Sequence, residues 1–358
     1  MAVALLRGEN FRLYRSLEIQ PHSGLNLITG GNAAGKTSLL EALFVAARGR
    51  SFRALSLSEL CGAERPEWNV FLETDQERHR VGLGWNRQGS EIRLDDTKNA
   101  RISDVVRLVP IQLIDPLAHR LLDEGPSYRR SFVDWGVFHV EHLFLDVWRR
   151  YQRALKQRNS ALRDQLEDRA VQAWNEELVA AGETLTAMRL SHVRAASAGL
   201  SAWVQRLLGT SDATCEWQRG WPDGEDFREL LDRNLDQHRR FGATIQGPHR
   251  AELKVRLNHA KAKGRVSRGQ QKLLITAMVL AQAELLAAAG APAPILLLDD
   301  FAAELSTEFQ SRLAAALIEY RGQKFVTAFE KPAIAGLGEG GLFHVEHGTI
   351  RSLNALHK

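Results

Sequence analysis

The chain has 358 residues, of which 44% are apolar and 25% charged, a balance typical of a folded protein with a sizeable core and not of a disordered chain. Its net charge of +4 permits an anionic partner without requiring one. Cys61 and Cys215 have no metal-ligand spacing, and no apolar run reaches the length of a membrane span or a signal-peptide core. We therefore expect a soluble cytoplasmic protein with free thiols and no membrane partner.

The first 120 residues show short strand patterns around one helix. An apolar run ends in a glycine-rich turn and continues directly as a helical pattern, so a strand, a turn and a helix follow one another. The predicted strands are 3–6, 12–20, 25–29, 68–74, 79–85, 91–94 and 110–114, and the predicted helices are 36–48 and 102–107.

From residue 127 to about 240, helical periodicity replaces the strand patterns. A first long helix carries Phe144, Tyr151 and Leu155 on one face, and a second, from Val171 to Ala195, repeats apolar residues at alternating three- and four-residue steps. This spacing predicts an antiparallel pair of helices with the charged segment 163–169 at its tip. A short strand near Cys215 and a helix over 225–240 follow, and we interpret His192, on the seam, as a packed histidine and not a ligand.

The remaining sequence returns to alternating strands and helices. Its predicted elements are a strand at 251–257, a basic loop at 259–266, an apolar helix at 270–289, a strand at 295–298, a helix at 307–320, a strand at 324–329 and a hairpin at 342–346 with 349–353. We therefore predict an α/β nucleotide-binding domain formed by residues 1–120 and 245–358, interrupted by a helical lobe at 121–244.

The turn after the strand at 25–29 matches the phosphate-loop pattern G-x-x-x-x-G-K-[ST] in full, with Gly30, Gly35, Lys36 and Thr37 at the fixed positions. Backbone N–H groups of such a loop, and of the helix that follows it, cradle phosphates. Lys36 has the reach for the β- and γ-phosphates of ATP, and the Thr37 hydroxyl can ligate Mg²⁺. The other loop residues expected at the nucleotide are Gly31, Asn32, Ala33 and Ala34.

Two acids follow the strand at 295–298, which is apolar on both faces and so belongs inside a parallel sheet. Ligands bind at the carboxyl ends of such strands, which places Asp299 where it can hold the Mg²⁺ engaged by Thr37. Asp300 comes next, where a carboxylate can orient or deprotonate an attacking water. Two solvent-facing acids at a strand end are the plainer alternative.

Ser267 and Gln270 form a capping box at the start of the apolar helix over 270–289. A helix that begins with serine and glycine also offers an anion-binding N-terminus. Because the chain's own phosphate loop already provides one such site, this second one is predicted to serve a nucleotide held by another copy of the chain.

These motifs occur in an order that resembles a known family. GGNAAGKTSLLEAL, PIQLIDP, QGPHRAEL, SRGQQKLL and LLLDDFAAEL resemble, over essentially the whole length, ATPases of the ATP-binding-cassette (ABC) type in the branch of the SMC and Rad50 proteins. Within that branch the chain is similar to the RecF family of bacterial recombinational repair. The fold implied is an ABC-type P-loop ATPase domain with an inserted helical, antiparallel coiled-coil lobe.

The resemblance implies further site residues. Gln112 becomes the Q-loop glutamine that reaches Mg²⁺ and the γ-phosphate, and Ser267 with Gly269 becomes the signature motif that contacts the nucleotide of an opposing subunit. Asp300 stands where cassette ATPases mostly carry glutamate, and Thr327 lies in the segment where a switch histidine is expected. The shorter reach of Asp300 indicates slow hydrolysis, and the missing histidine indicates a switch rather than a motor. Ser306 replaces the final aspartate of the D-loop, so the resemblance does not carry over the cross-subunit contacts expected there.

The resemblance also implies partners: DNA, ATP-dependent dimerisation, and the RecR and RecO proteins, with a role near gapped DNA, in recombinase loading and in the SOS response, and a location at the nucleoid. A run of basic residues on the first long helix suits DNA phosphates, although a solvated helix face is an equal alternative. The candidate DNA-binding residues are Arg149, Arg150, Arg153, Lys156, Arg158 and Arg163 on this helix, and Lys261, Lys263, Arg265 and Arg268 beside the signature motif. Arg250 in GPHR is a candidate for contact with nucleotide or DNA, with a tight turn into the following strand as the alternative.

Three other classes of protein remain to be weighed. A structural ATPase of the SMC sort would carry arms far longer than the helical insertion of this chain. A transporter ATPase subunit would carry the signature LSGGQ and no long insertion, and a metabolite kinase would need neither the signature helix nor the arm.

Overall fold

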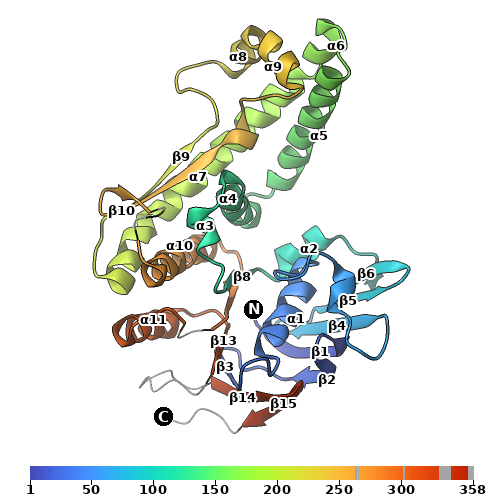
Figure 1. The fold of residues 1–358 in the computed structure, drawn as a ribbon, viewed down its shortest axis with the longest axis vertical. Helices are drawn as coiled ribbons and strands as arrows, with labels where there is room; N and C mark the ends of the chain where they lie inside the picture. The colour runs from blue at the N-terminus through green and yellow to red at the C-terminus, as the bar shows by residue number, and fades with distance from the viewer. Residues whose placement is uncertain (263, 265, 301–302, 330–339, 354–358) are drawn as a thin grey trace. The chain divides into compact units, whose positions relative to one another are not determined.

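The computed structural model describes residues 1–262, 264, 266–300, 303–329 and 340–353. The chain divides into two compact units. Figure 1 shows the fold with colours that run from blue at the N-terminus to red at the C-terminus. Unit 1 comprises Met1–His119, Arg206–Gly209 and Ser267–Lys358, and unit 2 comprises Arg120–Gln205 and Thr210–Val266.

The centre of unit 1 is a mainly parallel sheet in the order β15-β14-β3-β13-β12-β8. Its strands are β3 (Leu25–Thr29), β8 (Ile111–Ile114), β12 (Ile295–Leu298), β13 (Lys324–Ala328), β14 (Gly340–Glu346) and β15 (Thr349–Leu353). Only β15 runs antiparallel to its neighbour. Every residue of β3, β12 and β13 is buried, which explains why these strands are apolar without alternation.

A second, antiparallel sheet in unit 1 has the order β2-β1-β4-β5-β6-β7. Its strands are β1 (Val3–Phe11), β2 (Tyr14–Ile19), β4 (Trp68–Thr74), β5 (Arg80–Asn86), β6 (Gly89–Leu94) and β7 (Thr97–Lys98). Helix α1 (Lys36–Arg48) contacts strands of both sheets, and its Leu39 and Leu43 belong to one core with Val70 and Phe325. The phosphate-loop helix is therefore held between two sheets.

Among its described residues, unit 1 also contains the helices η1 (Leu57–Leu60), α2 (Ile102–Leu108), α10 (Arg268–Ala288) and α11 (Thr307–Glu319). Helix α10 contacts β8 and α11. By length and composition α10 could cross a membrane, but 78% of its most apolar window is buried inside the protein, as in the core helix of a globular domain. This burial explains the long apolar run.

Unit 2 combines helices with a three-stranded sheet of order β11-β10-β9. Its helices are α3 (Arg120–Asp123), α4 (Pro126–Val140), α5 (Phe144–Arg163), α6 (Asp168–Gln172), α7 (Asn175–Leu208), α8 (Phe227–Arg233), α9 (Leu235–Phe241) and η2 (Pro248–Arg250), and α7 continues into unit 1. Its strands are β9 (Ala213–Gln218), β10 (Glu252–Leu257) and β11 (Ala260–Lys261). Helices α5 and α7 run antiparallel, as predicted (Figure 1).

A buried arginine holds the helical part of unit 2 together. Arg158 on α5 is fully buried, and it donates from Nε to Asn175 Oδ1 at 2.8 Å and from Nη1 to Thr244 Oγ1 at 2.7 Å. Burial lowers the pKa of Arg158 to about 10. Placing Arg158 on the solvent-facing basic stripe was therefore wrong, because this side chain joins α5 to α7 and to the loop after α9.

Two of the predicted boundaries that differ from the structure concern the second half of unit 2. The strand predicted at 251–257 forms as β10, but it pairs with β9, so residues 245–266 belong to unit 2 and the chain returns to unit 1 at Ser267. The single helix predicted at 225–240 is divided into α8 and α9 at Asn234. The return to unit 1 lies at Ser267 and not at residue 245 because β10 pairs with β9, and a local sequence pattern does not specify which strands pair.

Candidate nucleotide site

The phosphate loop connects β3 to α1 and has the backbone its glycines permit. Gly30 has φ +149° and Gly35 has φ +124°, and a Cβ at Gly30 would lie 2.2 Å from the carbonyl oxygen of Val345. Gly35 is the N-cap of α1 and supplies no side-chain cap, so the first N–H groups of α1 remain available to an anion. The turn after β14 supports the loop, because Gly348 N–H donates to Ala34 O at 2.9 Å.

Lys36 lies across this loop. Its Nζ donates to Gly30 O at 2.7 Å and to Gly31 O at 2.8 Å, so the ammonium group stands over the loop. Burial lowers the pKa of Lys36, while the charges of Asp300 and Asp299 oppose this shift. Lys36 is followed by Thr37, whose hydroxyl contacts Asp299, so the loop lysine and the two acids belong to one region of unit 1.

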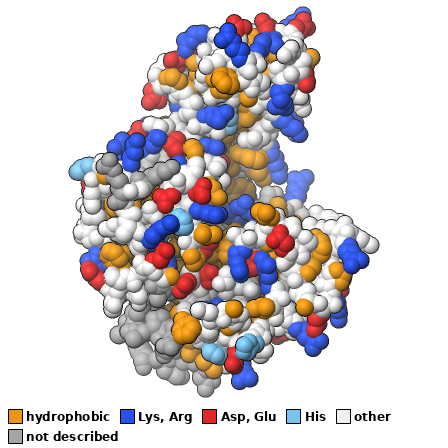
Figure 2. All heavy atoms as spheres, in the orientation of Figure 1, with side chains coloured by type: hydrophobic (Ala, Val, Ile, Leu, Met, Phe, Trp, Pro, Cys, Tyr) orange, Lys and Arg blue, Asp and Glu red, His pale blue; other side chains and the backbone are white. Residues whose placement is uncertain are grey.

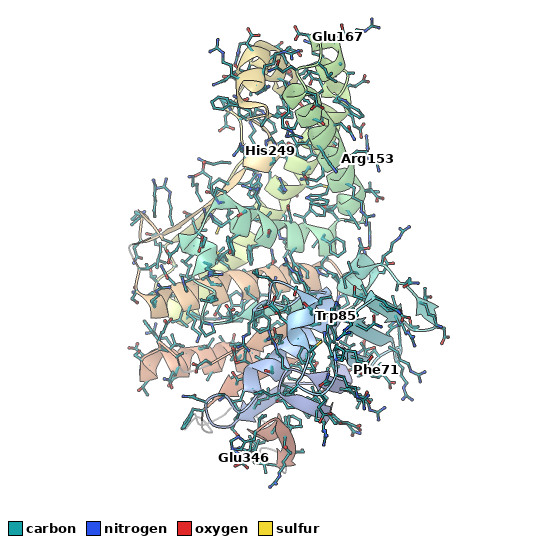
Figure 3. The ribbon with its side chains drawn as sticks, turned by 45° about the vertical axis from the view of Figure 1, so that its right-hand side comes forward. Phe71, Trp85, Arg153, Glu167, His249 and Glu346 are labelled. Atoms are coloured by element: carbon teal, nitrogen blue, oxygen red, sulfur yellow. The ribbon has the colours of Figure 1, made fainter. Side chains whose placement is uncertain are left out.

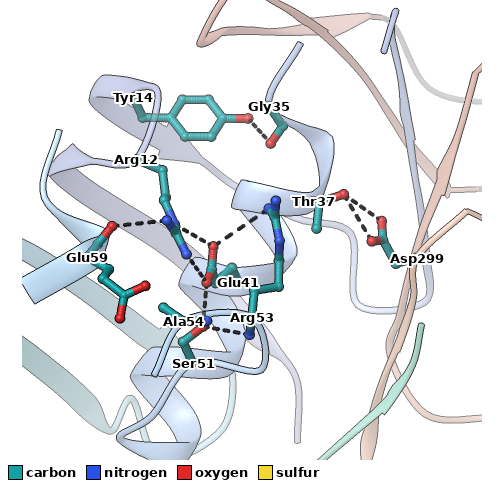
Figure 4. A network of polar contacts seen from close by, with 10 residues as sticks. All are labelled: Arg12, Tyr14, Gly35, Thr37, Glu41, Ser51, Arg53, Ala54, Glu59 and Asp299. Carbon is teal, nitrogen blue, oxygen red and sulfur yellow. Dashed lines mark hydrogen bonds and ion pairs between the residues drawn. The ribbon is translucent and has the colours of Figure 1, made fainter. Parts of the chain in front are cut away.

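Thr37 and Asp299 meet at the carboxyl edge of the parallel sheet. Thr37 Oγ1 lies 3.0 Å from Asp299 Oδ1 and 2.9 Å from Asp299 Oδ2, as Figure 4 shows. Thr327, near the end of the adjacent β13, also donates to Asp299 Oδ1 at 2.8 Å. Two hydroxyls and a carboxylate, from the start of α1, from β13 and from the end of β12, thus form one oxygen-rich corner.

Asp300 follows Asp299 in a strained backbone conformation. Its φ is +54°, a left-handed value that side chains other than glycine adopt infrequently, and its side chain is exposed. Its N–H donates to Thr327 Oγ1 at 2.8 Å. Thr327 therefore contacts both acids, a role that we did not predict for it; the only sequence signal was its place in the segment where a histidine was expected.

Gln112 does not stand in this corner. It lies inside β8 opposite Leu296, three residues before Asp299 in the register, which is roughly 10 Å along a strand. Its Nε2 donates to Gln282 Oε1 on α10 at 3.0 Å. The proposed metal and γ-phosphate role of Gln112 is therefore not supported by its position, and Asp115 is the residue that follows β8 at this edge.

Behind the phosphate loop lies a charged network whose residues were not predicted to belong to the site. Glu41 on α1 is fully buried and accepts two hydrogen bonds from Arg12, at 2.8 and 2.9 Å, and one from Ser51 at 2.5 Å (Figure 4). Arg12 and Arg53 also line a cavity of about 440 Å³ beside Lys36 and Thr37. Two guanidinium groups thus face the space next to the loop.

The signature residues begin α10 as predicted. Ser267 is the N-cap, its side chain accepts from Gln270 N–H at 3.3 Å, and Gln270 Oε1 accepts from Ser267 N–H at 3.0 Å. Ser267 is exposed, whereas Gly269 is buried, and a Cβ at Gly269 would lie 2.7 Å from Glu304 O. The helix start is therefore open to a ligand at its serine and packed tightly at its glycine.

The basic candidates for DNA lie in unit 2, apart from Arg268. Figure 2 shows Lys and Arg side chains along the edge of unit 2 that α5 forms, and Arg153 points outward from this helix in Figure 3. The exposed candidates are Arg149, Arg150, Arg153, Lys156, Arg163, Arg250, Lys261 and Arg268. Arg150 is paired with Glu177 at 2.6 Å. Lys263 and Arg265 lie outside the described residues.

A sheet edge with a phosphate loop, a facing acid pair and a second helix start defines an ABC-type ATPase of the kind found in SMC heads. The family model described as the RecF/RecN/SMC N terminal domain matches residues 2–350. A solved Smc head domain from Pyrococcus furiosus has a TM-score of 0.61 and 16% identity, and the match covers 99% of this chain and 96% of that one.

The relatives narrow this class. The DNA replication and repair protein RecF of Thioalkalivibrio sulfidiphilus is 38% identical over 358 residues, covering 98% of this chain and 99% of that protein, and the one of Vibrio parahaemolyticus is 34% identical, covering 98% and 100%. The structure of the recombination mediator protein RecF-ATP in the RecFOR pathway has a TM-score of 0.83 at 23% identity and covers 98% of this chain and 97% of that one. The chain belongs to the RecF family.

Proposed function

We propose that this chain is an ATP-dependent DNA-binding protein of recombinational repair and replication restart, which dimerises on ATP and hydrolyses it slowly. The observation that carries the proposal is the contact between Thr37 and Asp299, residues 262 positions apart in the sequence. That contact brings the phosphate loop and the acid pair of unit 1 into one site. The names of the relatives, DNA replication and repair protein RecF, support the cellular role.

The residues of the corner fit Mg²⁺. Magnesium prefers hard oxygen ligands and is usually held by one or two carboxylates together with substrate phosphates. Thr37 Oγ1 and the carboxylate of Asp299 would hold the ion, which when bound supplies charge neutralisation at the β- and γ-phosphates. Among the described residues no group of three or more His, Cys, Asp and Glu side chains forms a metal site, so the nucleotide itself would complete the coordination.

The chain's own groups account for binding and slow hydrolysis. The N–H groups from Gly31 to Thr37 cradle the phosphates, and Lys36 exchanges its bonds to the loop carbonyls for bonds to phosphate oxygens. The exposed carboxylate of Asp300 orients an attacking water. Aspartate is one methylene shorter than glutamate, so its reach toward that water is smaller, which favours a switch over a fast enzyme.

The start of α10 supports the proposed dimerisation. Ser267 is exposed at the N-terminus of α10, and in the proposed dimer it covers the γ-phosphate held by the phosphate loop of the other copy. The site of each copy is then complete only in the dimer. Closing two copies on ATP couples nucleotide binding to the capture of DNA.

Basic residues of unit 2 are proposed to hold the DNA. Arg149, Arg153 and Lys156 are exposed on one helix, and Lys261 lies six residues before Ser267. Such a surface binds phosphates with weak sequence preference and strong salt dependence. On gapped DNA at the nucleoid, the clamp would help RecO and RecR to load recombinase and thereby support the SOS response.

Filter binding to gapped duplex DNA tests this function. The chain should retain DNA in the presence of ATP much better than in its absence, and replacing Arg153 and Lys156 by Gln should lower both the affinity and its dependence on salt, by about one phosphate contact per residue. Replacing Arg87 and Arg93 of unit 1 by Gln provides the matched control of equal charge change. Equal DNA retention with and without ATP would contradict the clamp.

A further inference from the structure

A buried lysine on the signature helix holds the backbone of the second acid. Lys272 of α10 is 4% exposed, and its Nζ donates to Asp300 O at 2.7 Å and to Ala303 O at 3.3 Å. Burial lowers the pKa of Lys272, and the neighbouring acids Asp300, Glu304, Asp299 and Asp115 oppose this shift. A buried ammonium is costly unless its donors are satisfied, so these carbonyl bonds have a structural reason to persist.

Both backbone polar groups of Asp300 are held by side chains. Its N–H donates to Thr327 Oγ1 at 2.8 Å, and its C=O accepts from Lys272 Nζ. Its φ of +54° costs free energy that the surrounding contacts have to offset, and such strain persists where neighbours over-determine the backbone. If either bond were lost, the backbone could relax toward negative φ and the carboxylate would turn away.

The same lysine links two parts of the proposed machinery. One turn before Lys272, Gly269 packs against Glu304 O so closely that a Cβ would lie 2.7 Å from that oxygen. The start of α10 and the segment after Asp300 therefore contact each other twice, at Gly269 and at Lys272. In the proposed dimer, the start of α10 faces the nucleotide of the partner copy. The segment that it contacts follows the acids of the same chain.

We infer that Lys272 is a positioning residue that keeps Asp300 in its strained, hydrolysis-competent conformation and couples the signature helix to it. This inference rests on the proposed role of Asp300 and goes beyond it, since Lys272 has no contact with nucleotide in the proposed function. Movement of the helix start on closure of the dimer would pass through Lys272 to the acid of the same chain. Each copy would thereby sense whether its signature motif is engaged.

The test replaces Lys272 by Met, with Lys324→Met as the matched control. Lys324 is also buried in unit 1, at 7% exposure, and its Nζ also donates to a carbonyl, Tyr320 O at 2.6 Å. It stands at the amino end of β13, three residues and roughly 10 Å before Thr327. Both variants lose a buried ammonium that is bonded to backbone, so a general loss of stability affects both.

Two measurements on the full chain decide the matter. Hydrogen exchange of the peptide spanning 299–305, measured without nucleotide, should be faster by about tenfold or more in Lys272→Met and unchanged in Lys324→Met. Single-turnover hydrolysis of ATP should fall by about 10- to 100-fold in Lys272→Met alone, while the affinity for a fluorescent ATP analogue stays within about twofold.

Unchanged exchange in Lys272→Met, or equal effects in the two variants, would overturn the positioning role. A loss of nucleotide affinity as large as the loss of hydrolysis would also overturn it, because the site as a whole would then have collapsed. If the wild-type chain retained no ATP, the proposed function would fail, whereas the exchange comparison needs no nucleotide and would still show whether Lys272 holds Asp300.

Discussion

At the scale of single residues, the nucleotide site depends on side chains that hold other side chains. Thr327 contacts both Asp299 and Asp300, and Glu41 gathers Arg12 and Ser51 behind the phosphate loop. None of these residues belongs to the phosphate-loop pattern itself. The motif provides the groups that meet phosphate, and the residues around it fix their geometry.

Glu41→Ala should destabilise the chain by about 3–5 kcal/mol, because it leaves the partly buried guanidinium of Arg12 without its carboxylate. Glu18→Ala is the matched control, since Glu18 pairs with Arg7 at 3.0 Å while both side chains are more than half exposed. The control should change the free energy of unfolding by at most about 1 kcal/mol. Urea unfolding measures the free energy of unfolding of both variants. Equal losses in the two would show that the ion pair of Glu41 and Arg12 contributes no more to stability than an exposed one.

At the scale of elements, patterns with a local cause were predictable. Helix α1 has the bounds predicted from the motif and its apolar repeat, and β12 was evident from four consecutive apolar residues before the two acids. The positions that failed depend on partners far away in the sequence. Gln112 is held by Gln282, and β10 pairs with β9, and neither partner can be read from the residues nearby.

The burial of Arg158 could have been predicted from its position on the helix. It lies three residues after Leu155 and seven after Tyr151, on the buried face of α5, so its helical spacing already separated it from the exposed Arg153 and Lys156. The predicted basic stripe was defined by the run of positive charges along the sequence, so it included Arg158 together with the exposed residues. Assigning each charge to a helix face would have placed Arg158 in the interior.

The stability of unit 2 should depend on pH through its buried histidines. Burial lowers the pKa of His192 and of His249 to about 4, and burial also lowers the pKa of His238. Between about pH 6.5 and 4 the unfolded chain therefore binds protons that the folded chain does not, so stability decreases as the pH falls through this range. Each of the first two histidines accounts for roughly 3 kcal/mol of this loss at most.

His192→Met should make the free energy of unfolding less dependent on pH, because the unfolded chain then has one histidine fewer to protonate. Urea unfolding followed by tryptophan fluorescence is suited to the measurement, because all of the 8 tryptophans except Trp68 and Trp85 belong to unit 2. His259→Gln is the control, since its side chain is 93% exposed. A slope in His192→Met equal to that of the wild type and of the control would contradict a neutral, buried His192.

At the scale of the whole molecule, the order of the chain links the two units at the signature motif. The chain leaves unit 2 at Val266 and begins unit 1 again at Ser267, the N-cap of α10. The exposed Lys261 lies just before this crossing, and Lys272 lies just after it. A short stretch of backbone thus connects a proposed DNA contact to the proposed cover of the partner's nucleotide and to Asp300.

The central claim is that two copies share each ATP, one through Lys36 and the other through Ser267, and mixing two variants tests it most directly. Lys36→Ala removes the phosphate contact, and Ser267→Asp keeps a helix cap but places a negative charge against the γ-phosphate of the partner copy. Each variant alone should neither dimerise on ATP nor hydrolyse it. An equal mixture should recover up to about half of the wild-type hydrolysis rate, because only mixed dimers can form and each of these has one complete site out of two. A mixture as inactive as its two components would contradict the shared site.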